Sequence, residues 1–239
     1  MTTSFDCSDP EGRSAGLARA QQAIAAKQCI VLPTDTVYGI GADAFSPQAV
    51  ATLLAAKGRG RSMPPPVLVP RLQTMDGLAV DVSTEARALA EAFWPGGLTL
   101  IFHAQPSLTW DLGDTKGTVA LRMPDDEVAL DLLALTGPMA VSSANRTGAP
   151  AAQTAAEAQA QLAESVEVYL EAGPRPQEGS EGIPSTIVDA TASPLRIVRA
   201  GAISVEELRA VVPSVLDLGE EPAPEVSDAG PEAEVTSPA

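Results

Sequence analysis

The sequence predicts one α/β domain built on a twisted, open, mixed β-sheet with flanking helices. Short apolar runs that have the character of strands alternate along the chain with segments that carry helix signals, and this alternation is typical of α/β proteins. A chain of 239 residues, 45% of them hydrophobic, is long enough to bury one core of this kind. No fixed-period repeat is present, so the sequence does not predict a solenoid.

The helices are predicted from the residues at their ends. Ser46 followed by Pro47 has the N-cap and first-turn proline of a helix start, and a proline–glycine–glycine run stops the helix that begins near Ser83. Thr154 and Ser204 each precede a glutamate by three residues, which is the capping-box spacing. These signals place helices at residues 14–28, 46–56, 83–93 and 125–135 and after Thr154 and Ser204.

The strands are predicted from short apolar stretches bounded by glycine, proline or polar residues. The first strand leads directly into a polar segment that starts at Pro33, and the others lie between or after the helix signals. We expect strands at residues 29–32, 67–69, 98–103, 118–121, 139–142, 167–170, 186–189 and 195–198.

The two ends of the chain differ in composition from its middle. Residues 213–239 contain seven acids, five prolines and no base, and such a segment cannot bury enough apolar surface to become ordered. We therefore expect a flexible N-terminus at residues 1–13, a folded domain at residues 14–212 and a disordered, acidic, proline-rich tail at residues 213–239.

Charge and cysteine content narrow the class of protein. The net charge is −16, and residues 1–212 alone carry −9, whereas a protein that binds duplex nucleic acid presents a basic face. Stable nucleic-acid binding is therefore not expected. No apolar run approaches the roughly 20 residues of a membrane span, and two cysteines are too few for a disulfide framework, so we expect a cytoplasmic protein. With one histidine besides, no metal site is expected.

Polar segments follow several predicted strands, at the position where open α/β sheets bind their ligands. Thr34, Asp35, Thr36 and Tyr38 follow the first strand, and they either hold the polar ends of a small molecule or form a local turn. Hydroxyls and an amide follow the strand at residues 139–142. No Walker A motif and no complete dinucleotide-binding motif occurs.

A basic cluster lies at the end of the helix that starts at Ser46. Lys57, Arg59 and Arg61 are three of the 15 basic residues, and two glycines alternate with them. One explanation is structural, because cations at a helix C-terminus offset the helix dipole. The other is a phosphate site, because glycine lets the backbone approach a ligand and the cluster concentrates positive charge in an acidic protein.

Taken in order, these segments resemble the threonylcarbamoyl-AMP synthase (YrdC-like) family over residues 14–212. The K-x-R…S-x-N signature of that family is matched by Lys57-Gly58-Arg59 and Ser143-Ala144-Asn145. The remaining matches are PTDTVYG at residues 33–39, VALRMP around Arg122, PSTIVD at residues 184–189 and RAG at residues 199–201. The resemblance implies the YrdC-like fold, in which an open sheet with flanking helices surrounds a central cavity.

The resemblance also implies a reaction and its partners. Members of this family combine L-threonine, bicarbonate and ATP into threonylcarbamoyl-AMP and diphosphate, which makes them nucleotidyltransferases. Mg²⁺ is expected to enter with ATP. A separate transferase complex then passes the threonylcarbamoyl group to tRNA, so the acidic charge of this chain fits an enzyme that does not itself hold the tRNA.

Site residues follow from the matched motifs. Lys57 and Arg59 are the expected catalytic residues, because they would spread positive charge over the triphosphate, and Arg122 is expected to pair with the threonine carboxylate. The resemblance implies an ATP-binding set of Lys57, Arg59, Arg61, Thr118, Ser143, Ala144, Asn145 and Arg199. It implies a threonine-binding set of Thr36, Arg122, Ser142 and Ser185, with Thr34 and Tyr38 lining the same pocket.

The sequence departs from the family pattern in one place, and two other functions stay open. Where family members often have P-L-x-V-H after the basic cluster, residues 64–70 are PPPVLVP, with two extra residues and no histidine. A carbamoyl-adenylate-forming domain of the hydrogenase-maturation type shares the YrdC-like pattern but sits in a longer chain. A non-catalytic RNA-binding or ribosome-assembly protein would use the same basic cavity, and the net charge argues against it.

Overall fold

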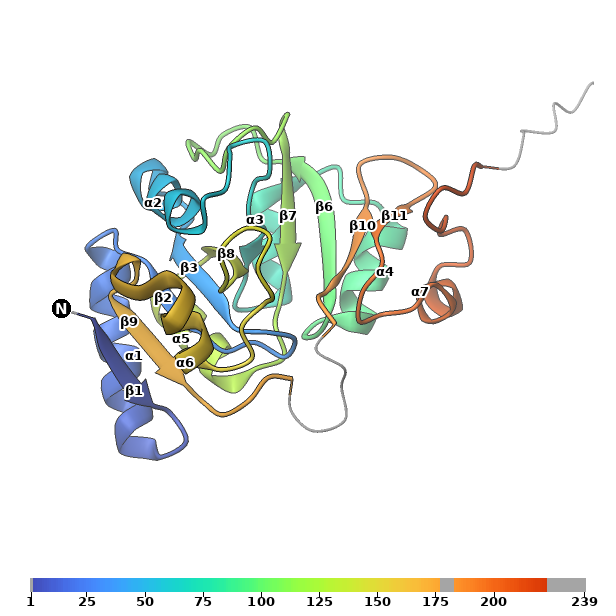
Figure 1. Ribbon diagram of the computed structural model, residues 1–239. Coiled ribbons are helices and arrows are strands. Elements are labelled where there is room, and N and C mark those ends of the chain that lie inside the picture. Colours follow the sequence, from blue (N-terminus) through green and yellow to red (C-terminus); the bar gives the residue numbers. More distant parts are fainter. Residues whose placement is uncertain (1, 177–182, 223–239) are drawn as a thin grey trace, which may run out of the picture.

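Among residues 2–176 and 183–222, which the computed structural model describes, eleven strands join into one twisted sheet (Figure 1). The strands are β1 (Thr3–Asp6), β2 (Ile30–Leu32), β3 (Gly39–Asp43), β4 (Val67–Leu68), β5 (Ala79–Val80), β6 (Leu98–Ala104), β7 (Thr118–Arg122), β8 (Met139–Ser143), β9 (Val168–Glu171), β10 (Thr186–Asp189) and β11 (Arg196–Arg199). They are paired in the order β1-β9-β2-β3-β8-β4-β7-β6-β10-β11, and β5 pairs with β6. Parallel pairs such as β4–β7 adjoin antiparallel pairs such as β6–β7, so the sheet is mixed, as the sequence predicts.

The helices predicted after Ser46, Ser83, Thr154 and Ser204 begin where these capping residues place them, whereas the helix predicted at residues 14–28 begins earlier, at Pro10. The helices are α1 (Pro10–Ala25), α2 (Pro47–Lys57), α3 (Met75–Leu78), α4 (Thr84–Phe93), α5 (Glu127–Thr136), α6 (Ala155–Leu162) and α7 (Val205–Val211), with short 3-10 turns at Leu72–Thr74 and Ala163–Ser165. Ser46 and Ser83 accept hydrogen bonds from backbone N–H groups in the first turns of α2 and α4. The capping box of α7 is complete, with Ser204 and Glu207 each bonded to the other's backbone N–H. Thr154 caps α6 alone, because the Glu157 carboxylate accepts from Gln153 N instead.

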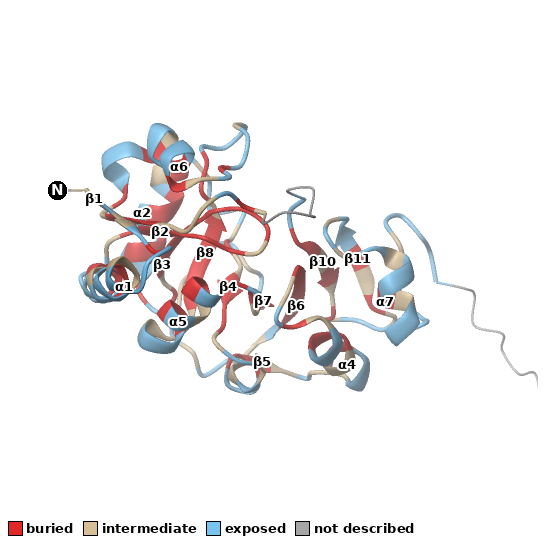
Figure 2. Ribbon diagram, turned by 90° about the horizontal axis from the view of Figure 1, so that it is seen from below, coloured by how far each residue is buried: buried red, intermediate tan, exposed pale blue. Residues whose placement is uncertain are grey.

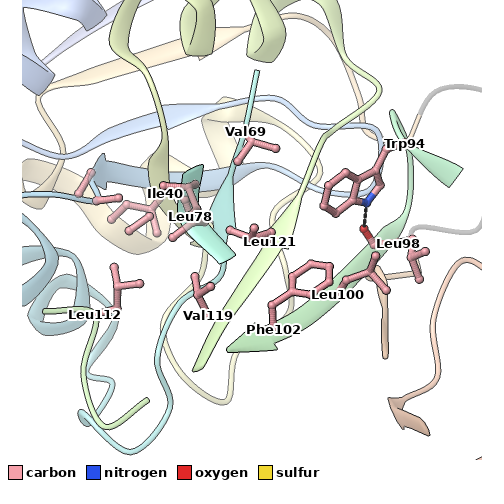
Figure 3. Packing of buried hydrophobic residues seen from close by; sticks show 14 of the residues in the cluster. Ile40, Val69, Leu78, Trp94, Leu98, Leu100, Phe102, Leu112, Val119 and Leu121 are labelled. Atoms are coloured by element: carbon pink, nitrogen blue, oxygen red, sulfur yellow. Dashed lines mark hydrogen bonds between the residues drawn. The ribbon is translucent and has the colours of Figure 1, made fainter. Parts of the chain in front are cut away.

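The core has two parts on opposite faces of the sheet. Alternate residues of a strand point to opposite faces, and Ile30 and Leu32 pack with α1 and α5 while Val31 packs with α2 and α6. All three residues are fully buried, as is typical of a strand covered on both faces (Figure 2). At the other end of the sheet, the indole N–H of Trp94 donates to the Leu98 carbonyl at 2.7 Å, beside the packed side chains of β6 and β7 (Figure 3).

The expectation of a flexible segment at residues 1–13 is wrong for residues 3–13. Residues 3–6 form β1, which pairs in parallel with β9, and Asp9 caps α1, which begins at Pro10. The side chain of Cys7 is buried and that of Phe5 partly buried against the α1–α5 core, so this short strand has enough apolar contact to be ordered.

The C-terminal boundary also lies further along the chain than expected. Val215 and Leu216 are buried, and Leu216 forms a β-bridge with Arg196 of β11. The described residues after 212 therefore pack on the domain, while the acidic tail from residue 223 lies outside the described residues. In residues 2–176 and 183–222, no helix is long and apolar enough to cross a membrane.

Candidate active site

A cavity of about 290 Å³ opens between the central strands of the sheet and the loops that follow them. Its walls come from β6, β7, β8 and β10, from the segment after β2 and from the segment after α2. The polar side chains that line it are Thr34, Thr36, Tyr38, Arg59, Thr99, Thr115, Thr118, Arg122, Ser142, Ser143, Ser185 and Arg199. Segments far apart in the sequence thus supply hydroxyls and cations to one space.

Three arginines give the cavity its charge. Arg59, Arg122 and Arg199 line it, and no aspartate or glutamate is among the lining residues of the described chain. Burial, and then the charges of Arg122 and Arg59, lower the pKa of Arg199. Mutual repulsion of this kind is relieved by an anionic ligand, so the charge of the cavity favours an anion.

Arg59 carries the clearest sign of a missing partner. It follows Gly58, which ends α2 in the left-handed conformation at φ 62° and turns the chain toward the cavity. Its Nη1 donates to the Ser142 hydroxyl at 2.8 Å. Its Nε is buried and has no hydrogen-bond partner among the described residues. A buried guanidinium N–H without an acceptor is costly, so a ligand oxygen at this atom would stabilise the site.

Arg122 is held in place from three sides. Nε donates to the Gly96 carbonyl at 2.9 Å, Nη1 to the Thr36 hydroxyl at 3.1 Å and Nη2 to the Asp35 carboxylate at 2.7 Å. Asp35 also accepts from the backbone N–H of Asp125, which fixes the carboxylate in turn. A guanidinium has five N–H groups, so each terminal nitrogen keeps one for a ligand. This is the pair of donors that a carboxylate takes in a bidentate contact.

Arg199 and Ser185 form another part of the wall. The Arg199 guanidinium donates to the Ser185 carbonyl at 2.5 Å and 3.1 Å and to the Ser185 hydroxyl at 3.0 Å, and that hydroxyl lies 2.8 Å from the Thr99 hydroxyl. Gly201 makes this packing possible, because a Cβ there would lie 2.3 Å from the Pro184 carbonyl oxygen. A side chain at position 201 would therefore clash with the backbone, which explains why the RAG segment has glycine there.

Lys57 does not line the cavity. Its ammonium donates to the Ser143 and Asn145 carbonyls at 2.5 Å and 2.6 Å, and its side chain is buried. Burial, and secondly the charge of Arg59, lower the pKa of Lys57 to about 8. Lys57 thus holds the end of β8 and the residues that follow it, and Ser142 and Ser143 of β8 reach the cavity.

The other predicted residues divide in the same way. Arg59, Thr118, Ser143, Arg199, Thr36, Arg122, Ser142 and Ser185 line the cavity, whereas Lys57, Arg61, Ala144 and Asn145 are not among its lining residues. Asn145 donates to the Arg146 and Ala149 carbonyls and so shapes its own turn. Ala144 donates its N–H to the Tyr38 carbonyl. Arg61 turns outward and pairs with Asp111.

Thr34 and Tyr38 border the cavity, but their hydroxyls are engaged elsewhere. Thr34 donates to the Val37 carbonyl at 2.6 Å, and the Tyr38 hydroxyl donates to Glu171 or to the Gly173 carbonyl. Burial raises the pKa of Tyr38, so its phenol stays protonated. The segment after β2 therefore forms a local turn and also borders the cavity. The prediction that it holds the polar ends of a small molecule stays a prediction.

Sequence reasoning missed two of the polar wall residues. Thr99 lies inside an apolar strand, and its only signal was a polar residue at an otherwise apolar position. Thr115 belongs to the long connection between β6 and β7, which carried no motif. Prolines 64–66 of the divergent segment also line the cavity, at the place where the family pattern breaks.

The mixed sheet, its flanking helices and the cavity between its strands place the chain in the YrdC-like class of α/β proteins. A family model described as "Telomere recombination", the Sua5/YciO/YrdC family, matches residues 22–201. The chain belongs to this family.

Individual members of the family are similar to this chain over most of its length. A Mycobacterium tuberculosis protein provisionally named threonylcarbamoyl-AMP synthase is 53% identical over 212 residues, which cover 89% of this chain and 96% of that protein. The threonylcarbamoyl-AMP synthase of Pyrococcus abyssi is 34% identical over 184 residues, covering 77% of this chain and 53% of that protein. The crystal structure of P. abyssi Sua5 complexed with L-threonine superposes with a TM-score of 0.84 at 29% identity, over 91% of this chain and 63% of that one. The chain thus spans nearly all of the mycobacterial relative and little more than half of the archaeal synthase.

Proposed function

We propose that this chain is an L-threonylcarbamoyladenylate synthase, which converts L-threonine, bicarbonate and ATP into threonylcarbamoyl-AMP and diphosphate. The observation that carries the proposal is the cavity with three arginines, no carboxylate among its described lining residues and an unpartnered guanidinium N–H. Its substrates would bring a triphosphate and an amino acid carboxylate, which are the anions that this arrangement favours.

The triphosphate is proposed to lie against Arg59 and Arg199. The free Nε of Arg59 supplies a donor that no described residue uses, and Ser143 and Thr118 border the same region. Lys57 contributes through its long-range charge and by holding the Ser143 backbone, since its N–H groups point at carbonyl oxygens. This modifies the expected role of Lys57 from a direct phosphate contact to a positioning one.

Threonine is proposed to bind at Arg122. The two free N–H groups on its terminal nitrogens fit a carboxylate, and Asp35, Thr36 and Gly96 hold the guanidinium still, so little side-chain entropy is lost on binding. The hydroxyls of Ser142 and Ser185 lie in the same cavity and offer partners for the amine and the side-chain hydroxyl of the substrate.

The chemistry needs positioning more than proton transfer. Threonine and bicarbonate give the carbamate with loss of one water and one proton, and a carbamate oxygen then attacks the α-phosphorus while the bond to the bridging oxygen of diphosphate breaks. The carbamate is already an anion, so no general base is required at this step. No histidine, aspartate or glutamate is among the described lining residues. The arginines would lower the repulsion between two anions and stabilise the charge that develops on diphosphate.

Mg²⁺ is proposed to arrive as part of the nucleotide substrate. Among the described residues, no cluster of three or more histidines, cysteines or acidic residues is placed to hold a metal ion. The cavity wall also presents hydroxyls and cations. The ligands of the ion would therefore come from phosphate oxygens and water, as is common for Mg²⁺.

The product is proposed to pass to a separate tRNA threonylcarbamoyl transferase complex in the cytoplasm. The support is the charge of the chain, because a net charge of −16 opposes stable binding of tRNA by this protein itself.

Mass spectrometry of the products tests the proposed function. With ATP, L-threonine and carbon-13 bicarbonate, we expect labelled threonylcarbamoyl-AMP and an equal amount of diphosphate, and neither when any substrate is omitted. Carbamoyl phosphate with ATP serves as the control for the carbamoyl-adenylate alternative. Diphosphate release without threonine, or adenylate formed only from carbamoyl phosphate, contradicts the proposal.

A further inference from the structure

The connection between β6 and β7, residues 105–117, closes one side of the cavity and has no part in the proposed chemistry. Leu112 and Thr115 of this connection line the cavity, as do Thr118 and Arg59. The connection has almost no regular secondary structure, so its position depends on contacts with the rest of the chain. Those contacts determine whether the wall next to the proposed triphosphate site is in place.

Arg61 makes the most specific of these contacts. Its Nη2 and Nη1 donate to the two oxygens of Asp111 at 2.8 Å and 3.1 Å, and its Nε lies 3.6 Å from Asp114. The backbone of Arg61 also contacts the connection, because the Asp114 N–H donates to the Arg61 carbonyl at 2.8 Å. Side chain and backbone of one residue therefore hold residues 111–114 against the segment that follows α2.

The packing at this junction leaves no room for adjustment. Gly113 has φ 107°, and a Cβ at that position would lie 2.6 Å from the Arg61 carbonyl oxygen. Asp111 also accepts from the Gly113 N–H at 3.0 Å, so the same carboxylate fixes the turn and pairs with Arg61. The Arg61 guanidinium lowers the pKa of Asp111, which keeps the carboxylate ionised.

A second attachment lies at the other end of α2. Trp110 stacks on Phe45, with ring centroids 5.5 Å apart and an interplanar angle of 19°. Phe45 precedes α2 and Arg61 follows it, so the connection is fastened to both flanks of the helix that leads to Arg59. Displacement of residues 110–115 would therefore remove Leu112 and Thr115 from the wall of the cavity that Arg59 also lines.

We infer that Arg61 is a positioning residue, which acts through Asp111 to hold the 111–115 segment as the wall of the nucleotide site, and that it does not contact the phosphates. The inference rests on the proposed function for the identity of the ligand. The contact itself is independent of it, because the ion pair and the Asp114–Arg61 hydrogen bond are formed without any ligand. The two roles of Arg61 differ in the expected effect of changing Asp111. If Arg61 positions the segment, loss of Asp111 should weaken nucleotide binding as much as loss of Arg61, whereas loss of Asp111 should matter less if Arg61 contacts the phosphates directly.

Variants of the pair separate the two roles. The pair is solvent-exposed, so its effect is modest: we expect Arg61→Ala and Asp111→Asn each to raise the Kd for MgATP, measured by calorimetry, by about fivefold. The double variant should be no weaker than either single one, because both changes break the same contact. The exchanged pair, Arg61→Asp with Asp111→Arg, should restore much of the affinity. If turnover is measured, KM for ATP should rise while kcat stays within about twofold.

Amide hydrogen exchange gives a readout that needs no substrate. In Arg61→Ala and Asp111→Asn, exchange at the Asp114 amide should become faster, because its acceptor on Arg61 is no longer held in place. Arg87→Ala is the matched control, since Arg87 forms an exposed ion pair with Asp76 at 2.6 Å that does not join the cavity wall, and it should change neither exchange nor affinity.

Two results would overturn the inference. If Arg61→Ala weakens MgATP binding by the same factor in the Asp111→Asn background, Arg61 contacts the nucleotide directly. If exchange at Asp114 and the affinity are both unchanged, the pair does not position the segment. A third outcome is faster exchange in the variants while the wild type binds no ATP. That result would confirm the Arg61–Asp111 contact but overturn the role assigned to it. The proposed function itself is judged separately, by the product assay.

Discussion

Lys57 and Arg59 stand two residues apart in one motif, yet the fold uses them differently. Arg59 projects into the cavity with an unpartnered N–H, whereas Lys57 has its donors on two backbone carbonyls. The difference arises because Gly58 adopts a left-handed conformation and ends the helix between them. One residue is therefore available to a ligand and the other is part of the structure that supports the site.

Arg59→Ala should reduce kcat/KM for ATP by roughly 100-fold, about 3 kcal/mol, because it removes a cation from the proposed triphosphate site. Arg59→Lys should recover only part of this loss, since an ammonium keeps the charge but not the planar fork. Steady-state kinetics measures both. A loss of less than about threefold in Arg59→Ala, with the urea midpoint unchanged, would contradict a direct role.

Lys57→Met should destabilise the fold by about 2 kcal/mol, because it removes the ammonium donor from the Asn145 carbonyl and from the Ser143 carbonyl, which keeps only the Asn145 N–H. Urea unfolding measures this. If Lys57 were instead a direct phosphate ligand, it would be a buried cation without an anion in the free protein. Its removal would then leave stability unchanged or improved and would abolish ATP binding, and this result would contradict the account.

The lowered pKa of Lys57 predicts the direction of a pH effect. The folded chain releases the Lys57 proton near pH 8, while the unfolded chain keeps it up to the ordinary pKa of 10.5. In that window the unfolded state binds more protons, so the contribution of Lys57 to stability increases as pH rises from about 8 toward 10.5. The free energy of unfolding of the wild type, relative to Lys57→Met, should therefore rise over this range, and a fall would contradict the lowered pKa.

At the scale of the elements, the geometry of the cavity depends on where two connecting segments cross. The segment after β11 crosses the segment before β10 so closely that a Cβ on Gly201 would lie 2.3 Å from Pro184 O and 2.4 Å from Thr186 N. Both neighbours are backbone atoms, which cannot rotate away as a side chain can. The same crossing holds Ser185 against Arg199.

Gly201→Ala should destabilise the protein by about 2 kcal/mol, because the crossing segments must separate. It should also lower turnover, since Ser185 and Arg199 move with those segments. Thermal unfolding and kinetics measure the two effects. Gly77→Ala in α3 is the control, because a Cβ at Gly77 meets nothing within 4 Å and alanine is the better helix former, so this variant should lower neither stability nor turnover. Equal behaviour of the two variants would contradict the steric account.

The sequence was most informative where local chemistry determines the element. Ser46, Ser83 and Ser204 place helix starts because capping is a contact between near neighbours. It failed for β3, where Gly39 and Gly41 weaken the strand signal. Both glycines are explained by long-range packing, since a Cβ on either would lie 2.6 Å from a side chain of β8.

The candidate site was likewise predictable in some respects and not in others. Its motifs name the right segments, but the direction of each side chain depends on tertiary contacts that no local pattern encodes. Lys57 points at the Ser143 carbonyl at the end of β8 and Arg61 points at Asp111, two partners that lie 86 and 50 positions away in the sequence. The sequence therefore predicted which segments meet and most of the polar side chains that line the cavity, but not that Lys57 and Arg61 turn to other partners.

At the scale of the whole molecule, charge is separated between surface and cavity. The chain carries a net charge of −16, yet the described cavity wall presents three arginines and no carboxylate. Such an arrangement attracts small anions into the cavity and disfavours a polyanion on the outer surface. It suits an enzyme that makes an adenylate and passes it on.

The most direct test is a crystal structure of the chain with L-threonine and a non-hydrolysable ATP analogue. The account predicts a phosphate oxygen within hydrogen-bonding distance of Arg59 Nε, the threonine carboxylate on the two free N–H groups of Arg122, and Lys57 still bonded to the Ser143 and Asn145 carbonyls. A nucleotide bound outside this cavity, or phosphates held by Lys57 and Arg61 in place of Arg59, would contradict it.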